Sequence, residues 1–260
     1  MAKNGDLAPP MMTEDDVLVA EVRPEDGYRY LEMGIHPEKA SQPDGMNEAG
    51  LTVIGCGQKV RDGSEAAASG ADIGMSVYEM QRQISRQCAT VDEAIAVLEA
   101  SPRGFTGRTL ILGDASGRWA KVEISYADIA VFRPEPDRDF PANHVTAGVS
   151  GTFSAPHMRP LVTTRQQRPA AYVRYDRYMS VLTRDAGNID IGYAKSLVAE
   201  HDQGRTPNSI CKHTEGDAVV KVSGHNEGPT LESFIFEPQQ RRVWAAKGHP
   251  CDGNFVELAL

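Results

Sequence analysis

Four short motifs hold the residues of this sequence whose types and spacing could do chemistry. They offer ammonium, carboxamide and carboxylate groups, which can hold a polarised carbonyl and the charge that develops on it. The motifs are Lys3-Asn4-Gly5-Asp6, Met46-Asn47-Glu48-Ala49-Gly50-Leu51, Ala142-Asn143-His144 and Ser209-Ile210-Cys211-Lys212-His213. Taken singly, each has a plain structural explanation. An Asn-Gly pair near a chain end, for example, is usually a solvated turn.

The cysteines indicate neither a metal site nor a disulfide framework. Cys56, Cys88, Cys211 and Cys251 are widely scattered and form no C-x-x-C pair. Free buried thiols in a reducing compartment are therefore the expected state. The sequence also has no P-loop, no H-E-x-x-H and no G-x-G-x-x-G motif. We expect neither a metal nor another cofactor.

Cys56 is the internal cysteine that most resembles a nucleophile. It stands between Gly55 and Gly57 at the end of an expected strand, where the backbone could come close to a ligand. No histidine or aspartate spacing marks a Cys-His centre, and an internal cysteine has no α-amino group to serve as its base. We therefore interpret Cys56 as structural, and Cys211 as a core residue.

Composition narrows the class of protein. The chain has 260 residues, 40% of them hydrophobic and 24% charged, which is ordinary for a globular protein with a substantial core. Its net charge of −9 argues against nucleic-acid partners and anionic membranes. No stretch has the length of a membrane span, and the start lacks the apolar region of a secretory signal. We expect a cytoplasmic protein.

Hydrophobic periodicity predicts grouped strands separated by helices. The expected strands are residues 17–22, 28–33, 51–54, 109–112, 119–124, 129–132, 218–222, 231–236 and 242–246. The expected helices are two consecutive ones in residues 76–100, followed by residues 172–182 and 191–201. Thr90 and Glu93 form a capping box between the first two helices, and Pro102 ends the second. Residues 133–170 are expected to be loop.

This order of elements favours antiparallel sheets covered by helices, which is the α+β class. The sequence contains no internal repeat, no low-complexity tract and no interdomain linker. We therefore expect residues 1–260 to form a single domain.

In their order along the chain, the four motifs resemble those of the acyl-coenzyme A:6-aminopenicillanate acyltransferase-like family. This is the C45 peptidase branch of the N-terminal-nucleophile hydrolases, and the resemblance runs from Ala2 to the C-terminus. It implies a four-layer αββα sandwich of two mainly antiparallel sheets. It also implies an amide (C–N) hydrolase or acyltransferase that acts on a small linear amide. In the family, an N-terminal cysteine forms a thioester, and its own α-amino group serves as the base.

The resemblance also assigns roles to residues of the first motif. Asp6 becomes a catalytic carboxylate that orients the amino group of the nucleophile. Lys3 becomes a substrate-binding residue that lines the same pocket, and Asn4 is expected to fix a turn there. A pocket with these groups would suit a substrate with a polar or anionic feature.

Two later motifs complete the site that the resemblance implies. Asn143 becomes the catalytic oxyanion donor and His144 a substrate-binding neighbour, although a turn after Pro141 also explains this asparagine. Lys212 stands where the family has arginine, and it keeps the charge without the planar fork. A surface cation before an acidic loop is an equal alternative for Lys212.

The family's cysteine precedes the Lys-Asn-x-Asp motif by more residues than the five that precede Asp6 here. The sequence therefore predicts that the nucleophile is missing from this chain. Two alternatives follow: a catalytically inactive truncated homologue or binding domain, and a C69-like dipeptidase, whose start is similar. The motif at residues 209–213 favours C45. The expected partner is a small-molecule amide or acyl substrate, and a homo-oligomer is left open.

Overall fold

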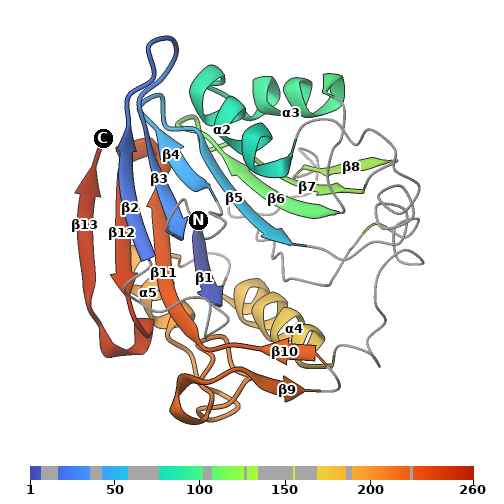
Figure 1. Ribbon diagram of the computed structural model, residues 1–260, viewed down its shortest axis with the longest axis vertical. Helices are drawn as coiled ribbons and strands as arrows, with labels where there is room; N and C mark the ends of the chain where they lie inside the picture. Colours follow the sequence, from blue (N-terminus) through green and yellow to red (C-terminus); the bar gives the residue numbers. More distant parts are fainter. Residues whose placement is uncertain are drawn as a thin grey trace.

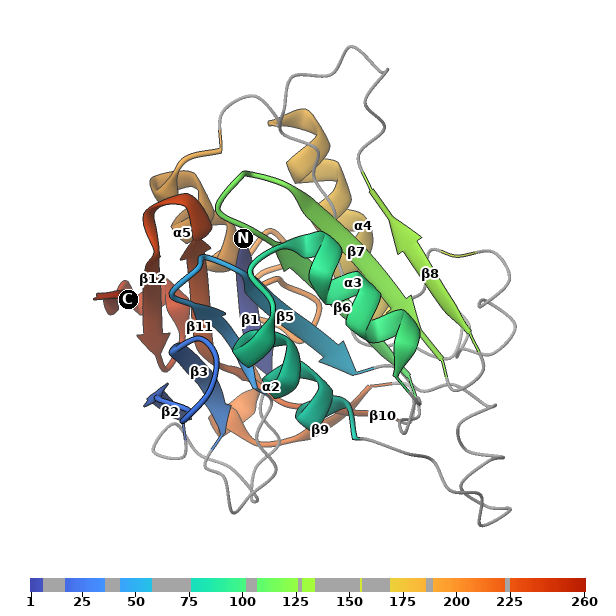
Figure 2. The ribbon, with the colours of Figure 1, turned by 90° about the horizontal axis from the view of Figure 1, so that it is seen from above.

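Two antiparallel β-sheets organise the chain (Figures 1 and 2). The computed structural model describes residues 1–6, 17–35, 43–57, 76–101, 107–125, 128–133, 155, 169–185, 189–222 and 225–260. The larger sheet consists, in spatial order, of β2 (Val17–Val22), β3 (Tyr30–Ile35), β4 (Asp44–Asn47), β5 (Thr52–Gly57), β6 (Arg108–Gly113), β7 (Trp119–Ile124) and β8 (Ile129–Phe132). The smaller sheet consists of β1 (Ala2–Asp6), β11 (Thr230–Glu237), β12 (Arg242–Lys247) and β13 (Phe255–Ala259). A separate ribbon pairs β9 (Val220–Val222) with β10 (His225–Glu227).

The helices lie outside the paired sheets (Figure 2). They are α2 (Val77–Gln87), α3 (Val91–Ala100), α4 (Pro169–Arg184) and α5 (Ile191–Val198). Capping boxes begin α2 at Ser76 and α3 at Thr90, and Asp190 caps α5. In each case a side-chain oxygen accepts a hydrogen bond from a backbone N–H of the first turn, which would otherwise lack a partner. No described helix combines the length and apolar character needed to cross a bilayer.

Among the residues that the structure describes, three hydrophobic clusters hold the layers together. The first, which includes Leu51, Met80 and Leu110, lies between α2 and α3 and the larger sheet. The second, which includes Met46 and Phe234, fills the space between the two sheets. The third joins α4 to α5, and α5 lies over β1 and β11 on the outer face of the smaller sheet. The result is the predicted αββα order of layers.

The structure confirms most of the predicted elements and corrects several boundaries. The strands at residues 119–124 and 129–132 and the capping box at Thr90 agree with the prediction. The helix predicted for residues 191–201 ends at Val198, because the chain then turns so that Glu200 O accepts from Cys211 N at 3.1 Å. The predicted loop at residues 133–170 lies mostly outside the described residues, as does Pro102, and α4 begins at its end, at Pro169.

Periodicity does not reveal the strands β1, β4, β10 and β13. β1 has the sequence AKNGD, which lacks an apolar alternation. It forms a strand because it pairs with β11 from Ala2 opposite Ile235 to Asp6 opposite Thr230. The expectation that Asn4 fixes a turn is therefore wrong: tertiary pairing overrides the local preference of Asn-Gly for turns.

The second motif has a structural role at the junction of the larger sheet with α2. Asn47 is fully buried, and its Nδ2 donates to Ser85 O at 2.8 Å and to Cys88 O at 2.7 Å. Its Oδ1 accepts from Leu51 N at 2.9 Å. Gly50 follows with φ 91°, and a Cβ there would lie 2.7 Å from Pro238 O. Asn47 thus provides hydrogen-bond donors for carbonyls at the C-terminal end of α2, and Gly50 forms a turn that requires glycine.

Replacing Asn47 with alanine should destabilise the protein by about 2–4 kcal/mol, because two buried carbonyls and one buried N–H lose their partner. Urea unfolding at pH 7 measures the change. Asn254→Ala is the matched control, since Asn254 is exposed and its replacement should change stability by less than about 0.5 kcal/mol. Equal stabilities of the two variants would contradict the role assigned to Asn47.

Candidate functional site

β1 presents the residues of the first motif to alternate faces of the smaller sheet, as a strand requires. Lys3 points into the space between the sheets, where its ammonium forms an ion pair with Asp44 on β4 and donates to Gly55 O at 2.9 Å. The Asp44 side chain is only 2% exposed. Its carboxylate also accepts from Gly55 N at 2.6 Å and from Gln81 Nε2 at 3.3 Å. This buried side chain is therefore paired and hydrogen-bonded, which offsets the cost of burying it.

Asn4 points to the opposite face and holds the chain that follows α5. Its Nδ2 donates to Val198 O at 2.8 Å and to Ile210 O at 2.9 Å. One side chain thus connects β1 to the end of α5 and to the motif at residues 209–213. Asn4 is a structural clamp in this fold. Its role in substrate binding stays a prediction, since both of these contacts of its amide are with backbone carbonyls.

Gly5 makes room for a buried carboxyl group on β11. A Cβ at Gly5 would lie 1.9 Å from Glu232 Oε1, so only glycine fits opposite this side chain. Burial raises the pKa of Glu232 to about 7; Lys3 opposes this rise, whereas Asp44 and Asp6 add to it. Glu232 Oε2 is buried and has no hydrogen-bond partner among the described residues. A buried carboxyl group that titrates near neutral pH marks a candidate functional position.

Asp6 forms a second ion pair, with Lys212. Asp6 Oδ2 lies 3.0 Å from Lys212 Nζ, and Asp6 Oδ1 accepts from Thr230 Oγ1 at 2.8 Å. The Lys212 side chain is 3% exposed, whereas that of Asp6 is 33% exposed. The alternative that Lys212 is a surface cation is therefore wrong, because its ammonium is buried against a carboxylate. The accessible part of the pair is Asp6.

Further polar groups extend the buried network from Asp44 across the larger sheet. Gln81 Oε1 accepts from Arg108 Nη2 at 3.1 Å, and a Cβ at Gly55 would lie 2.5 Å from that same nitrogen. The guanidinium of Arg108 also lies 5.6 Å from the centroid of the Tyr78 ring. Around the ends of β1 and β5, the protein therefore has buried cations and one buried carboxyl group, that of Glu232, whose pKa is about 7.

The cysteines of this region lack the features of a nucleophile. Burial raises the pKa of Cys56, and the Lys3 and Arg108 cations only partly offset this rise. Burial also raises the pKa of Cys88 to about 11. Both thiols are therefore protonated at neutral pH, and a protonated thiol attacks a carbonyl poorly. The interpretation of Cys56 as structural agrees with these surroundings.

The structure brings together only some of the predicted site residues. Lys3 and Asp6 share β1 but face opposite sides, and each has its own ion-pair partner. Both act on the carboxyl group of Glu232, which electrostatically links the two pairs. Asn143 and His144 lie outside the described residues, so their predicted roles remain predictions.

Nearly the whole chain matches one known family of enzymes. The family described as acyl-coenzyme A:6-aminopenicillanic acid acyl-transferase matches residues 1–252. The chain belongs to this family. Its members are amide hydrolases and acyltransferases of the N-terminal-nucleophile type. The match covers the motif on β1 and the one at residues 209–213, which meet in the Asp6–Lys212 pair.

Solved structures similar to this chain include bacterial acylases and hydrolases. Penicillin V acylase from Agrobacterium tumefaciens is 16% identical, with a TM-score of 0.47, over 95% of this chain and 78% of that one. A mutant of conjugated bile acid hydrolase from Clostridium perfringens is 13% identical, with a TM-score of 0.49, over 100% of this chain and 92% of that one. No match was found among curated proteins.

Sequence reasoning missed Asp44, Thr230, Glu232 and Tyr178. Thr230 and Glu232 reach the site because β11 pairs with β1, and Asp44 reaches it because the larger sheet packs against Lys3; no local pattern predicts either contact. Tyr178 lies on α4. Burial raises its pKa, and the Asp6 carboxylate is the next cause. Its hydroxyl stays protonated at neutral pH and remains a hydrogen-bond donor in the neighbourhood of Asp6.

Glu232 should make stability depend on pH. Its folded pKa of about 7 exceeds the ordinary value of 4.5, so the folded state holds the proton more tightly than the unfolded state. This contribution is complete below pH 4.5 and is lost as the pH rises through 7. Between about pH 5.5 and pH 8.5 the loss should be about 2 kcal/mol.

Urea unfolding of wild-type protein and Glu232→Gln at both pH values measures this loss. The amide mimics the protonated carboxyl group, so the variant should lack this part of the pH dependence and be the more stable protein at the higher pH. Glu99→Gln changes an exposed carboxylate and should follow wild type. An identical pH dependence in wild type and Glu232→Gln would refute the assignment.

Proposed function

We propose that this protein cleaves a small linear amide and transfers the acyl group to water or to an amine, at the region around Asp6, Lys212 and Glu232. Membership of the acyltransferase family supports the reaction class. The observation that carries the location is the Asp6–Lys212 pair, which joins two family motifs 206 residues apart at a partly exposed carboxylate.

The charges around this pair suit the chemistry of acyl transfer. The carboxylate of Asp6 can orient and stabilise a protonated amino group, which is the base that an N-terminal nucleophile uses. Lys212 fixes Asp6 in position from the buried side, since its ammonium is held by the fold. Lys3 places a second cation on the opposite face of β1, where it is paired with Asp44.

The proposed chemistry uses an N-terminal thiol and none of the four internal cysteines. In the first half-reaction the α-amino group takes the thiol proton, and the sulfur attacks the amide carbon to form an S–C bond. The amide C–N bond then breaks, and the amine leaves with the proton from the α-ammonium group. In the second half-reaction water or an amine attacks the thioester and releases the thiol. Asn143 is the proposed donor to the oxyanion in both steps, by resemblance to the family.

The first test separates internal from N-terminal nucleophiles. Residues 1–260 are incubated with a panel of N-acyl amines and hydroxylamine, and acyl hydroxamate is measured. We expect no product, because none of the four internal cysteines carries the free α-amino group that serves as the base in this family. Product formation that Cys56→Ser abolishes would show that the nucleophile is internal. A form extended at its N-terminus so that it starts with cysteine should release product; its failure would favour a binding domain.

The second test addresses the Asp6–Lys212 pair in whichever form is active. Lys212→Met should lower kcat/KM by about 100-fold or more, because Asp6 loses the cation that holds it. Lys221→Met is the matched control, since Lys221 is exposed on β9 and should retain wild-type kcat/KM. Circular dichroism and thermal unfolding check that both variants fold. Equal activity of a folded Lys212→Met variant would exclude the proposed location.

A further inference from the structure

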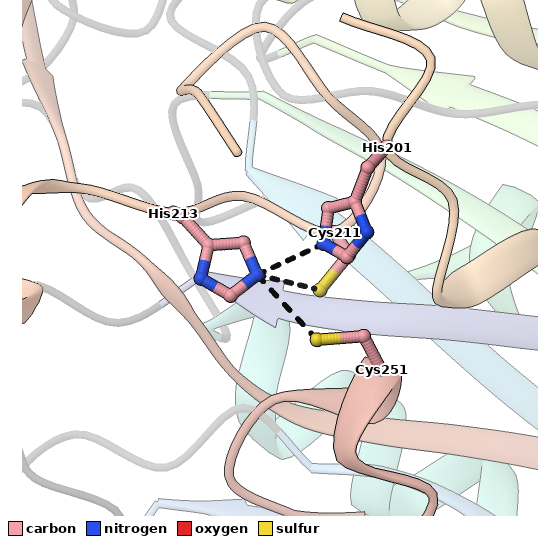
Figure 3. Close-up of side chains that lie close together, drawn as sticks. All are labelled: His201, Cys211, His213 and Cys251. Atoms are coloured by element: carbon pink, nitrogen blue, oxygen red, sulfur yellow. Dashed lines mark hydrogen bonds between the residues drawn. The ribbon is translucent and has the colours of Figure 1, made fainter. Parts of the chain in front are cut away.

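Four metal-ligating side chains converge from three separate segments on the outer side of the smaller sheet (Figure 3). His201 follows α5, Cys211 and His213 flank Lys212, and Cys251 lies in the short helix η6 (Pro250–Asp252) between β12 and β13. Their ligand atoms all lie within 4.8 Å of one another. The sequence offered no signal for this cluster, because Cys211 and Cys251 are 40 residues apart and form no recognised spacing.

The distances within the cluster approach those of a tetrahedral metal centre. His213 Nε2 lies 3.6 Å from Cys211 Sγ and 3.5 Å from Cys251 Sγ. A tetrahedron with metal–nitrogen bonds of about 2.0 Å and metal–sulfur bonds of about 2.3 Å has nitrogen–sulfur edges of about 3.5 Å. His201 Nε2 lies 2.9 Å from His213 Nε2, and this edge would lengthen to about 3.3 Å around such a metal.

Hydrogen bonding alone does not account for the arrangement. The Nε2 atom of a neutral imidazole either donates one proton or accepts one hydrogen bond in the ring plane. His213 Nε2 faces three polar atoms, one nitrogen and two sulfurs, as the dashed lines in Figure 3 show. A single cation at the centre would serve all four ligand atoms at once.

We propose that His201, Cys211, His213 and Cys251 form a closed tetrahedral site for one divalent zinc ion. Two imidazoles and two thiolates are a ligand set that suits zinc, and the two thiolate charges balance the charge of the ion. Binding breaks two S–H bonds, forms two zinc–sulfur and two zinc–nitrogen bonds, and releases two protons to solvent. Because the protein supplies all four ligands, the site is structural and has no open position for a substrate. Such a site departs from the expectation, drawn from cysteine spacing, of a protein without a metal.

The surroundings of the ligands fit this role. Burial lowers the pKa of His213 to about 4, so its imidazole is neutral and can bind a cation at pH 7. Burial raises the pKa of Cys211 to about 12, and the Cys251 backbone N–H that donates to its sulfur opposes this rise. A bound zinc ion deprotonates a coordinating thiol in spite of such burial. The ring of His249 stacks on that of His213, with centroids 3.9 Å apart, and is held by Asp217 at 3.1 Å.

A catalytic Cys-His pair and a disulfide each fit these four side chains less well than a metal ion. A Cys-His nucleophile needs one thiol aligned with one imidazole, but here two sulfurs share the same nitrogen. A disulfide between Cys211 and Cys251 would leave both histidine nitrogens facing each other without a cation between them. Both cysteines are free in the structure.

Zinc at this position would stabilise the backbone that carries Lys212, and with it the Asp6–Lys212 ion pair. Lys212 lies between the ligands Cys211 and His213, and its ammonium pairs with Asp6. The ion would also join the end of α5, the segment at residues 209–213 and η6; the first two are already connected by the hydrogen bonds of Asn4. Zinc binding can be measured without turnover, so its outcome is independent of the proposed activity.

Metal content is measured in the full chain purified under reducing conditions. We expect one zinc per chain by elemental mass spectrometry, and a lower melting temperature after removal by a chelator. Cobalt should replace zinc and give the sulfur-to-metal charge-transfer band and visible absorption of a tetrahedral thiolate site. Wild-type protein that binds neither zinc nor cobalt, or binds cobalt without the sulfur band, would overturn the proposal.

Variants then identify the ligands. Cys251→Ser, at a half-buried position, should weaken zinc binding by more than about 100-fold, since loss of a ligand exceeds the roughly 10–100-fold effect of an outer partner. His201→Gln gives a second ligand variant should the first fail to fold. Cys88→Ala is the matched control and should keep one zinc per chain. Full zinc binding by Cys251→Ser and His201→Gln, or a Cys211–Cys251 disulfide in the wild-type protein, would contradict the assignment.

Discussion

The pairing of β1 with β11 is the constraint on which the rest of the structure depends. It places a short polar strand in the smaller sheet. One face of this strand looks toward the larger sheet, and the other face packs against α5. Strand alternation then sends Lys3 toward Asp44 in the larger sheet and Asn4 toward the carbonyls that follow α5. One strand of five residues thereby connects both sheets and the outer helical layer. An apolar strand could fill the same space. Its side chains could not form the ion pair with Asp44 or the hydrogen bonds to the carbonyls that follow α5.

Burying so many polar groups is costly unless each finds a partner. The chain meets this requirement around Asp44, whose carboxylate receives an ammonium, a backbone N–H and a side-chain amide. Glu232 is different, because the space opposite Gly5 holds its side chain without a partner for Oε2 among the described residues. Burial raises the pKa of Glu232, so its proton is retained to a higher pH. Asp44 thus has hydrogen-bond partners for its carboxylate, whereas Glu232 is a buried carboxyl group with a raised pKa. Buried carboxyl groups with shifted pKa values are common at functional sites.

On the outer side of the smaller sheet, buried polar groups again find partners in segments that are distant in sequence. The segment at residues 209–213 supplies a carbonyl to Asn4, a cation to Asp6 and two ligand atoms to the cysteine-histidine cluster. Cys211 and His213 belong to the cluster, whereas Lys212 between them pairs with Asp6. The position of the cation that pairs with Asp6 is therefore tied to the packing of the cluster.

Local periodicity and motif order were enough to predict the α+β class, most strands and helices, the capping box at Thr90 and the family. The folded chain was needed to show that β1 is a strand, that Lys212 is buried, and that Asp44 and Glu232 join the site. Those outcomes arise from contacts between residues as distant in sequence as Ala2 and Ile235, for which no local pattern exists. The cysteine-histidine cluster has the same origin, since three segments with unremarkable spacings meet only after the sheets have packed.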